Sequence, residues 1–138
     1  MRLVPLPAAV ALLASIVACS DAFQPSVDNV AGDYQVYAFT TVDTAGKKVD
    51  WFAAGATLAL TLNKDGTTAG QLHIPHYHFG GGDLYADMAG TWTLSGDTIT
   101  FAQAADTFMR DMPFFAGRNA LRGNASFADA TVRILLLK

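Results

Sequence analysis

Apolar and polar side chains alternate along much of the chain after residue 30. The clearest run is Thr57–Leu62, in which Leu58, Leu60 and Leu62 share one face of an extended segment and polar or small side chains share the other. Such period-two alternation is typical of a strand with one buried face. Residues 63–66 (NKDG) follow at once, and their Asp-Gly pair predicts a tight hairpin turn.

The same pattern, interrupted by turn residues, recurs to the end of the chain. It predicts eight strands, at residues 32–40, 47–52, 56–62, 67–75, 84–94, 98–102, 120–126 and 131–137. One short helix is predicted at 103–112, between the sixth and seventh strands, because Asp106 and Arg110 have the i, i+4 spacing of a surface ion pair. Many short strands with almost no helix favour an all-β antiparallel sandwich or barrel, and closure into a barrel would leave no unpaired edges.

The first eighteen residues have a different pattern. Arg2 precedes an apolar stretch that is too short, and too often interrupted by proline, to cross a bilayer of ~30 Å comfortably as a helix. This layout predicts a signal peptide at 1–18 that is removed. Residues 19–29 lack periodicity and mix Ser, Asp, Asn and Pro, which predicts a flexible tether. Residues 30–138 are then long enough for one domain with a real core.

The residues at the end of the predicted signal peptide, Ile16-Val17-Ala18-Cys19, resemble the bacterial lipobox. The resemblance implies cleavage before Cys19 by signal peptidase II and a diacylglycerol on its thiol. Ser20 in the next position is similar to lipoproteins sorted to the outer membrane. Cys19 is the only cysteine, so an intrachain disulfide is excluded. The alternative is an ordinary signal peptide cleaved elsewhere, with Cys19 as a small apolar residue.

Three motifs in order, Gly32-Asp33-Tyr34, residues 63–67 (NKDGT) and residues 90–99 (GTWTLSGDTI), resemble the lipocalin-like (calycin) domains of bacterial lipoproteins. The resemblance covers residues 30–138 and implies an antiparallel up-and-down barrel of about eight strands. It also implies that Tyr34 takes the position of a first-strand tryptophan, with Arg133 as the cation that packs over its ring.

Composition narrows the possible partners. The formal net charge is −3, and the nine Lys and Arg residues are scattered, so no basic stripe of the kind that binds nucleic acid is present. The chain has no Glu, no G-x-S-x-G motif and no cysteine besides Cys19, and no Asp–His spacing indicates an acid–base pair. We therefore expect neither enzymatic activity nor a cofactor.

All three histidines, His73, His76 and His78, fall within six positions of one another. In an extended segment His76 and His78 share a face, and two imidazoles at that spacing can hold a divalent metal with Asp83 or Asp87 as oxygen ligands. The favoured alternative is that these are solvated loop histidines at a barrel rim, beside a flexible glycine-rich hairpin end.

The numerous aromatic side chains are expected to belong mostly to the core: Trp51, Phe52, Tyr77, Phe79, Tyr85, Trp92, Phe101, Phe108, Phe114 and Phe115. A second apolar group, Met109, Met112, Pro113, Phe114 and Phe115, is expected to plug one end of the barrel or to form an exposed patch.

Three functions remain open. The first is a binding protein, anchored in the cell envelope through Cys19, that holds a small apolar ligand in or at the mouth of the barrel, with ligand-binding residues unassigned. The second is a filled barrel that acts as a structural or protein-interaction module, with an envelope protein as its partner. The third is a metal site at His73, His76 and His78. An eight-stranded barrel has room for side chains or for one small ligand, which separates the first two.

Overall fold

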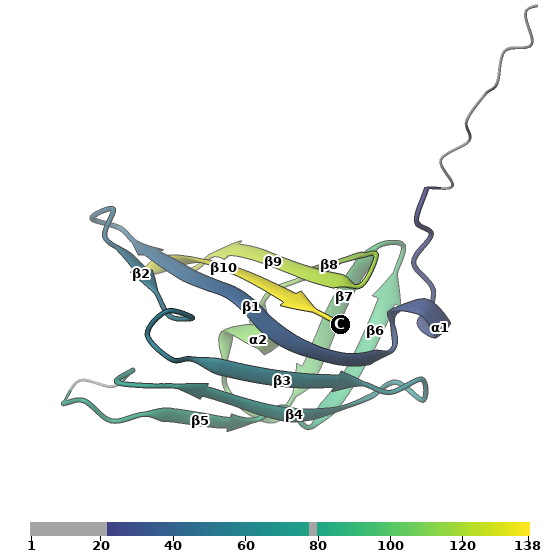
Figure 1. Cartoon of the computed structure of the whole chain (residues 1–138), viewed down its shortest axis with the longest axis horizontal. Helices are drawn as coiled ribbons and strands as arrows, with labels where there is room; N and C mark the ends of the chain where they lie inside the picture. The colour runs from purple at the N-terminus through teal and green to yellow at the C-terminus, as the bar shows by residue number, and fades with distance from the viewer. Residues whose placement is uncertain (1–21, 78–79) are drawn as a thin grey trace, which may run out of the picture.

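The chain folds into a closed, antiparallel β-barrel (Figure 1). The computed structural model describes residues 22–77 and 80–138. The strands of this part of the chain are β1 (Gly32–Asp43), β2 (Lys48–Asp50), β3 (Thr57–Leu62), β4 (Thr67–Ile74), β5 (Leu84–Asp87), β6 (Gly90–Ser95), β7 (Thr98–Gln103), β8 (Phe114–Gly117), β9 (Ala120–Ser126) and β10 (Ala130–Leu137). Its helices are α1 (Val27–Val30) and α2 (Phe108–Asp111).

Eight of these strands form the wall, in the order β1, β3, β4, β6, β7, β8, β9, β10, and β10 pairs with β1 to close it. β2 pairs only with β1, and β5 only with β4, so both extend the wall at one end. The predicted all-β barrel of about eight strands, with one short helix, is confirmed. Neither described helix is long and apolar enough to span a bilayer.

Alternation places the apolar side chains inside, as predicted. Leu58, Leu60 and Leu62 are each 1 % exposed, and the register of β3 against β4 pairs Leu58 with Leu72 and Leu62 with Thr68. The predicted turn at residues 63–66 joins these strands, and Gly66 has the positive φ of 87° that such a turn requires.

The end of the barrel nearest α1 is sealed by two buried aromatic side chains. The Tyr34 hydroxyl donates to the Val30 carbonyl at 2.6 Å, and the Trp92 indole donates to the Asn63 carbonyl at 2.8 Å. Burial raises the pKa of Tyr34 to about 12 because the phenolate would lose its hydration. The cation over the Tyr34 ring is Lys138, 5.8 Å from the ring centroid, so the expectation for Arg133 was wrong.

Arg133 cannot reach Tyr34 because of the phase of β10. Val132, Ile134 and Leu136 of this strand are buried, so Arg133 lies on the outer face, where it is exposed. Lys138, one residue beyond the strand, reaches over the sealed end instead, and its ammonium donates to the Asn29 carbonyl at 3.0 Å.

A β-bulge in β1 changes which side chains face the interior. The pairing with β10 runs Val36 to Leu136 and then Ala38 to Leu135, which leaves Tyr37 as the extra residue. Tyr34 is buried before the bulge and Phe39 after it, so the inward phase shifts from even to odd positions. The strand also continues to Asp43, three residues beyond the predicted end.

Other elements differ from prediction for local reasons. The single strand expected at 84–94 is two strands, because the chain leaves the ladder at Met88 and Ala89. The helix expected at 103–112 is only one turn. Arg110 does pair with Asp106 at 2.6 Å, as its spacing predicted. Asp106 lies before the helical turn, however, so the ion pair forms although a longer helix does not. The 47–52 segment contributes only β2, and the strand β8 was not predicted.

The N-terminal predictions fall mostly outside the described part. Residues 1–21, with the predicted signal peptide and Cys19, are not described. Of the predicted tether, residues 27–29 form α1 together with Val30. Ser26 and Asn29 cap this turn reciprocally, since the Ser26 hydroxyl accepts from the Asn29 amide and the Asn29 side chain accepts from the Ser26 amide.

Candidate ligand-binding site

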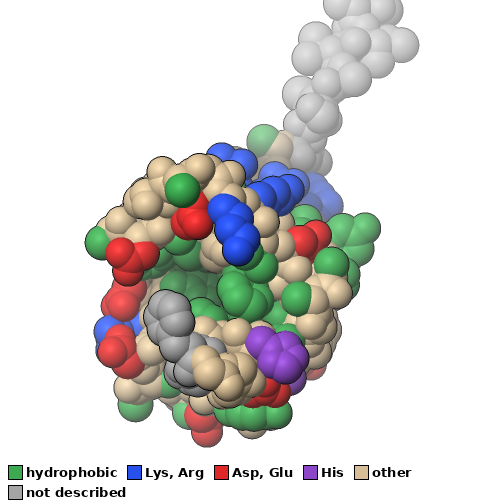
Figure 2. Space-filling model, turned by 90° about the vertical axis from the view of Figure 1, so that its left-hand side faces the viewer, with side chains coloured by type: hydrophobic (Ala, Val, Ile, Leu, Met, Phe, Trp, Pro, Cys, Tyr) green, Lys and Arg blue, Asp and Glu red, His purple; other side chains and the backbone are tan. Residues whose placement is uncertain are grey.

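The barrel end opposite α1 contains a cavity of about 530 Å³. Figure 2 looks into this end, and apolar side chains are visible within the hollow. The cavity is lined by Phe39, Thr41, Trp51, Tyr77, Leu84, Asp106, Thr107, Phe108, Asp111, Phe127, Asp129, Ala130 and Val132. Five of these are aromatic, which gives an apolar wall with a few polar groups, as is usual for small-molecule sites.

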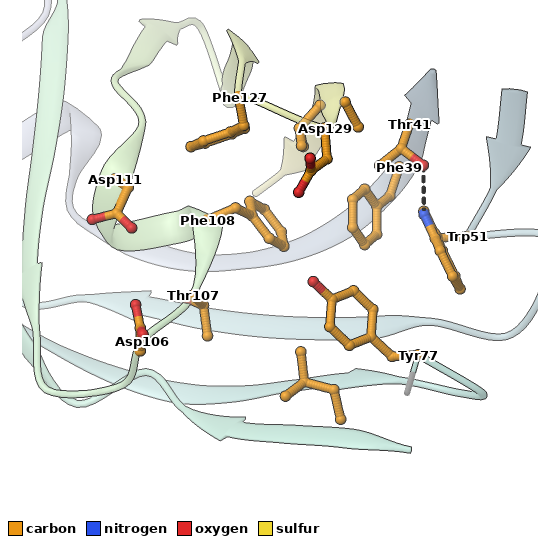
Figure 3. A pocket seen from close by; sticks show the side chains of 13 residues that line it. Phe39, Thr41, Trp51, Tyr77, Asp106, Thr107, Phe108, Asp111, Phe127 and Asp129 are labelled. Atoms are coloured by element: carbon orange, nitrogen blue, oxygen red, sulfur yellow. Dashed lines mark hydrogen bonds between the residues drawn. The ribbon is translucent and has the colours of Figure 1, made fainter. Parts of the chain in front are cut away.

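The bulge in β1 is one local cause of this site. It turns Phe39 and Thr41 inward beyond Tyr37, and both side chains line the cavity. Thr41 then positions Trp51 of the loop after β2, because its hydroxyl accepts a hydrogen bond from the indole nitrogen at 2.9 Å (Figure 3).

Aromatic rings from separate segments pack along the cavity. The ring centroid of Phe39 lies 5.1 Å from that of Phe108, at the start of α2, and 6.4 Å from that of Trp51. The Trp51 ring is 6.1 Å from that of Tyr77, in the loop after β4. Tilted pairs at these separations attract beyond their burial, so the rings form a connected wall.

The divergence of two wall segments leaves room for the cavity. Pairing between β6 and β7 ends at Gly90 and Gln103; from there the chain turns toward α2 instead of continuing beside β5. The carbonyl of Met88, at the break, accepts from the Thr68 hydroxyl at 2.6 Å and from the Gln103 amide at 3.0 Å. These buried bonds lie at the point at which the wall opens.

The polar groups of the cavity are mainly acidic. Asp106 and Asp111 both pair with the Arg110 guanidinium, at 2.6 Å and 2.8 Å. The hydrogen bond from Arg110 lowers the pKa of Asp111 below its ordinary value. Asp129, in the turn between β9 and β10, is exposed, and the hydroxyl of Thr107 is buried with no hydrogen-bond partner among the described residues.

The histidine segment lies at the end of the β4–β5 hairpin. His73 Nε2 is 2.8 Å from one Asp83 oxygen, and the other Asp83 oxygen accepts from the His76 amide at 3.0 Å. The hydrogen bond to the His73 side chain is the main reason that the pKa of Asp83 is lowered. His73 also stacks on Tyr85, with ring centroids 4.4 Å apart. Asp83 therefore ties the two arms of this hairpin together.

The structure does not bring a metal ligand set together within the residues it describes. Across 22–77 and 80–138, no group of three His, Cys, Asp or Glu side chains could hold an ion. Asp87, the other suggested oxygen ligand, instead accepts a hydrogen bond from the Ala89 amide at 2.8 Å. His78 lies outside the described residues, so the three-histidine site stays a prediction.

The sequence singled out part of the cavity, but for another role. Trp51, Tyr77 and Phe108 belong to a set of aromatic residues that were expected mostly in the core. All three line the cavity, and Trp51 and Phe108 also pack against the core. Phe127 and Asp129 lie between the strands predicted at 120–126 and 131–137, and no binding role was predicted for them. The only signal in the sequence was an aromatic and a charged residue together in a turn. Nothing local indicates that this turn lines the same cavity as Trp51.

Comparison with protein-family models, with curated proteins and with solved structures finds no match to this chain. Function is therefore inferred from the cavity and from the sequence motifs.

Proposed function

We propose that the protein is a lipid-anchored binding protein of the bacterial cell envelope that holds a small molecule with an apolar body in the open end of its barrel. The observation that carries the proposal is the aromatic cavity of about 530 Å³. Pockets for small molecules commonly measure ~300–1,000 Å³ and have mostly apolar walls with a few placed polar groups.

The ligand space is confined to one end because side chains fill the rest of the interior. Met109 and Met112 are 0 % and 2 % exposed, and Phe114 is 0 % exposed. The apolar group at residues 109–115 therefore contributes mainly to the core and not to an exposed patch. Phe115 is an exception and remains 46 % exposed. This filling limits the ligand to a compact molecule rather than a long chain threaded through the barrel.

The position of the N-terminal segment supports access to the cavity in an anchored protein. α1 lies at the sealed end of the barrel, and the cavity opens at the opposite end (Figure 1). Six residues lie between Cys19 and Ser26, the N-cap of α1, and the seven Cα–Cα steps across them could extend at most about 25 Å. This connection lets a barrel anchored through Cys19 in the outer membrane present its mouth away from the lipid surface.

Ligand binding predicts a molecule that co-purifies with the protein. Native mass spectrometry of the protein from its own host should show a non-covalent added mass of small-molecule size, beyond the covalent lipid expected on Cys19. Ala130 lines the cavity, so Ala130→Trp should fill it and remove that mass. Ala69→Trp adds the same bulk at an exposed position on β4 and should retain it. Absence of this mass from the wild-type protein, or its equal loss in both variants, contradicts the proposal.

Lipid anchoring predicts a simple change in location. Cys19→Ser removes the thiol that would be acylated, so the chain should move from the membrane fraction to the soluble envelope fraction. Two or more acyl chains are needed for firm anchoring. Mass spectrometry of the N-terminal peptide should find diacylglycerol on the wild-type protein and on a Ser20→Ala control. A Cys19 peptide without lipid in the control would show that this segment is an ordinary signal peptide.

A further inference from the structure

The wall of the cavity carries acidic side chains and no base. Among the described residues that line it are Asp106, Asp111 and Asp129, with no Lys or Arg. Arg110 neutralises part of this charge through its ion pairs with Asp106 and Asp111. Asp129 has neither an ion pair nor a hydrogen bond within residues 22–77 and 80–138. Three carboxylates against one guanidinium leave a net charge of −2 around the mouth, and Asp129 is the carboxylate without an ion pair.

The carboxylate of Asp129 is directed toward the aromatic part of the cavity. Figure 3 shows it extending from the β9–β10 turn toward the space between the rings of Phe108 and Phe39. A charged group of a ligand that lies against these rings would thus be close to a carboxylate. Opposite charge would be attracted there and like charge repelled.

The aromatic rings favour the same charge. The faces of Trp, Tyr and Phe rings attract cations through their quadrupole, with Trp the strongest. Trp51 is held in place by its bond to Thr41, and its neighbours Phe39 and Tyr77 continue the wall. A wall of this kind accepts the apolar body of an organic cation and also stabilises its charge.

We propose that the ligand is an organic amine, protonated at neutral pH, with its ammonium group beside the Asp129 carboxylate and its apolar body against the aromatic rings. This inference rests on the proposed function and specifies the chemical class of the ligand. It excludes fatty acids and other apolar anions, which an apolar cavity alone would admit.

The test uses probes that share a body and differ in charge. 4-Phenylbutylamine, 4-phenylbutanol and 4-phenylbutyrate are titrated into the full chain in lipid nanodiscs, with empty nanodiscs as the blank. Tryptophan fluorescence reports on the cavity through Trp51, and Trp51→Phe identifies the signal of Trp92. The amine should bind about tenfold more tightly than the alcohol, and the acid more weakly than the alcohol.

Two variants test whether the preference for the amine over the alcohol comes from Asp129 at the open end of the barrel. Asp129→Asn should weaken amine binding about fivefold and leave alcohol binding within about twofold, because an exposed carboxylate contributes a modest, charge-specific attraction. Asp28→Asn removes the same charge at the α1 end, where Asp28 pairs with Lys64 at 3.0 Å, and should change neither affinity. Added salt should weaken amine binding more than alcohol binding.

The outcomes separate the inference from the function on which it rests. Alcohol and acid binding equal to or tighter than amine binding would overturn the assignment of a cation while leaving the binding function intact. An amine preference unchanged in Asp129→Asn would also overturn it. Absence of binding by all three probes at about 1 mM, which corresponds to a very weak interaction, would count against both.

Discussion

Replacing Phe114 with alanine is expected to lower the free energy of unfolding by about 3–5 kcal/mol, as is usual when a buried aromatic ring is truncated. Phe114 is 0 % exposed, and its ring meets that of Phe101 edge-on at 5.4 Å. Its cross-strand partner on β9 is Gly123, where a side chain would collide with the Phe114 ring. Glycine at 123 thus makes room for the ring.

The adjacent residue supplies a matched control. Phe115 on the same strand is 46 % exposed and pairs with Arg122 on the outer face. Phe115→Ala removes the same atoms and should cost about 1 kcal/mol or less. Chemical denaturation, followed by circular dichroism, measures both variants. Equal effects at the two positions would mean that β8 is not held in the inward–outward phase described above.

This pair of residues also shows the limit of predicting strands from alternating apolar and polar residues. Residues 112–115 (MPFF) form a continuous apolar run, so no alternation distinguished an inward from an outward side chain. These residues lie between the strands predicted at 98–102 and 120–126, and β8 was missed. The leucines of β3 were predicted correctly because a polar or small residue separates each from the next, which leaves only one register that buries them.

The cavity could not be predicted because its residues meet only in the folded barrel. Phe39 was within a predicted strand, but its inward direction depends on the bulge at Tyr37, and the even-numbered phase set by Tyr34 would have turned it outward. A bulge inserts one residue without a strong sequence signal. Trp51, Phe108 and Phe127 come from loops, a helical turn and a hairpin, whose proximity is set by barrel closure.

The chemistry of the cavity was partly visible in the sequence. Asp106 and Arg110 were predicted to pair, and they do, which leaves Asp129 as the unpaired acid of the wall. The sequence indicated an apolar ligand because the predicted barrel has room for one small molecule, whereas the aromatic residues were expected to be mostly core. The preference for a cation follows only when an acid in a turn is seen to share one cavity with the rings.

Gly70 is the position at which β4 changes partners, and Gly70→Ala is expected to destabilise the fold by about 3–5 kcal/mol. Its φ of +132° is strained for any side chain, and a Cβ there would overlap the Ala59 carbonyl, within 2.8 Å of the carbonyl carbon. Backbone cannot move aside as a flexible side chain can, so the costs of strain and of the clash add.

A second glycine separates these two costs. Gly46, in the turn between β1 and β2, has a φ of +82°, but a Cβ there would meet nothing within 4 Å. Gly46→Ala should therefore show the cost of strain alone, about 1 kcal/mol. If the two variants have the same midpoint in chemical denaturation, the close approach of β4 to β3 contributes nothing and the larger value is wrong.

The same substitution also tests how the wall opens. Beyond Gly70, β4 pairs with β5 at residues 71–74, whereas before it β4 pairs with β6 at Thr67 and Thr68. The Gly70 carbonyl accepts from the Met88 amide at 3.0 Å and so bridges the break between β5 and β6. If this glycine sets the divergence, any folded Gly70→Ala protein should bind 4-phenylbutanol more weakly than Gly46→Ala does, because β5 carries Leu84 into the cavity wall. Unchanged binding would place the cause of the opening in the Met88 bonds to Thr68 and Gln103 instead.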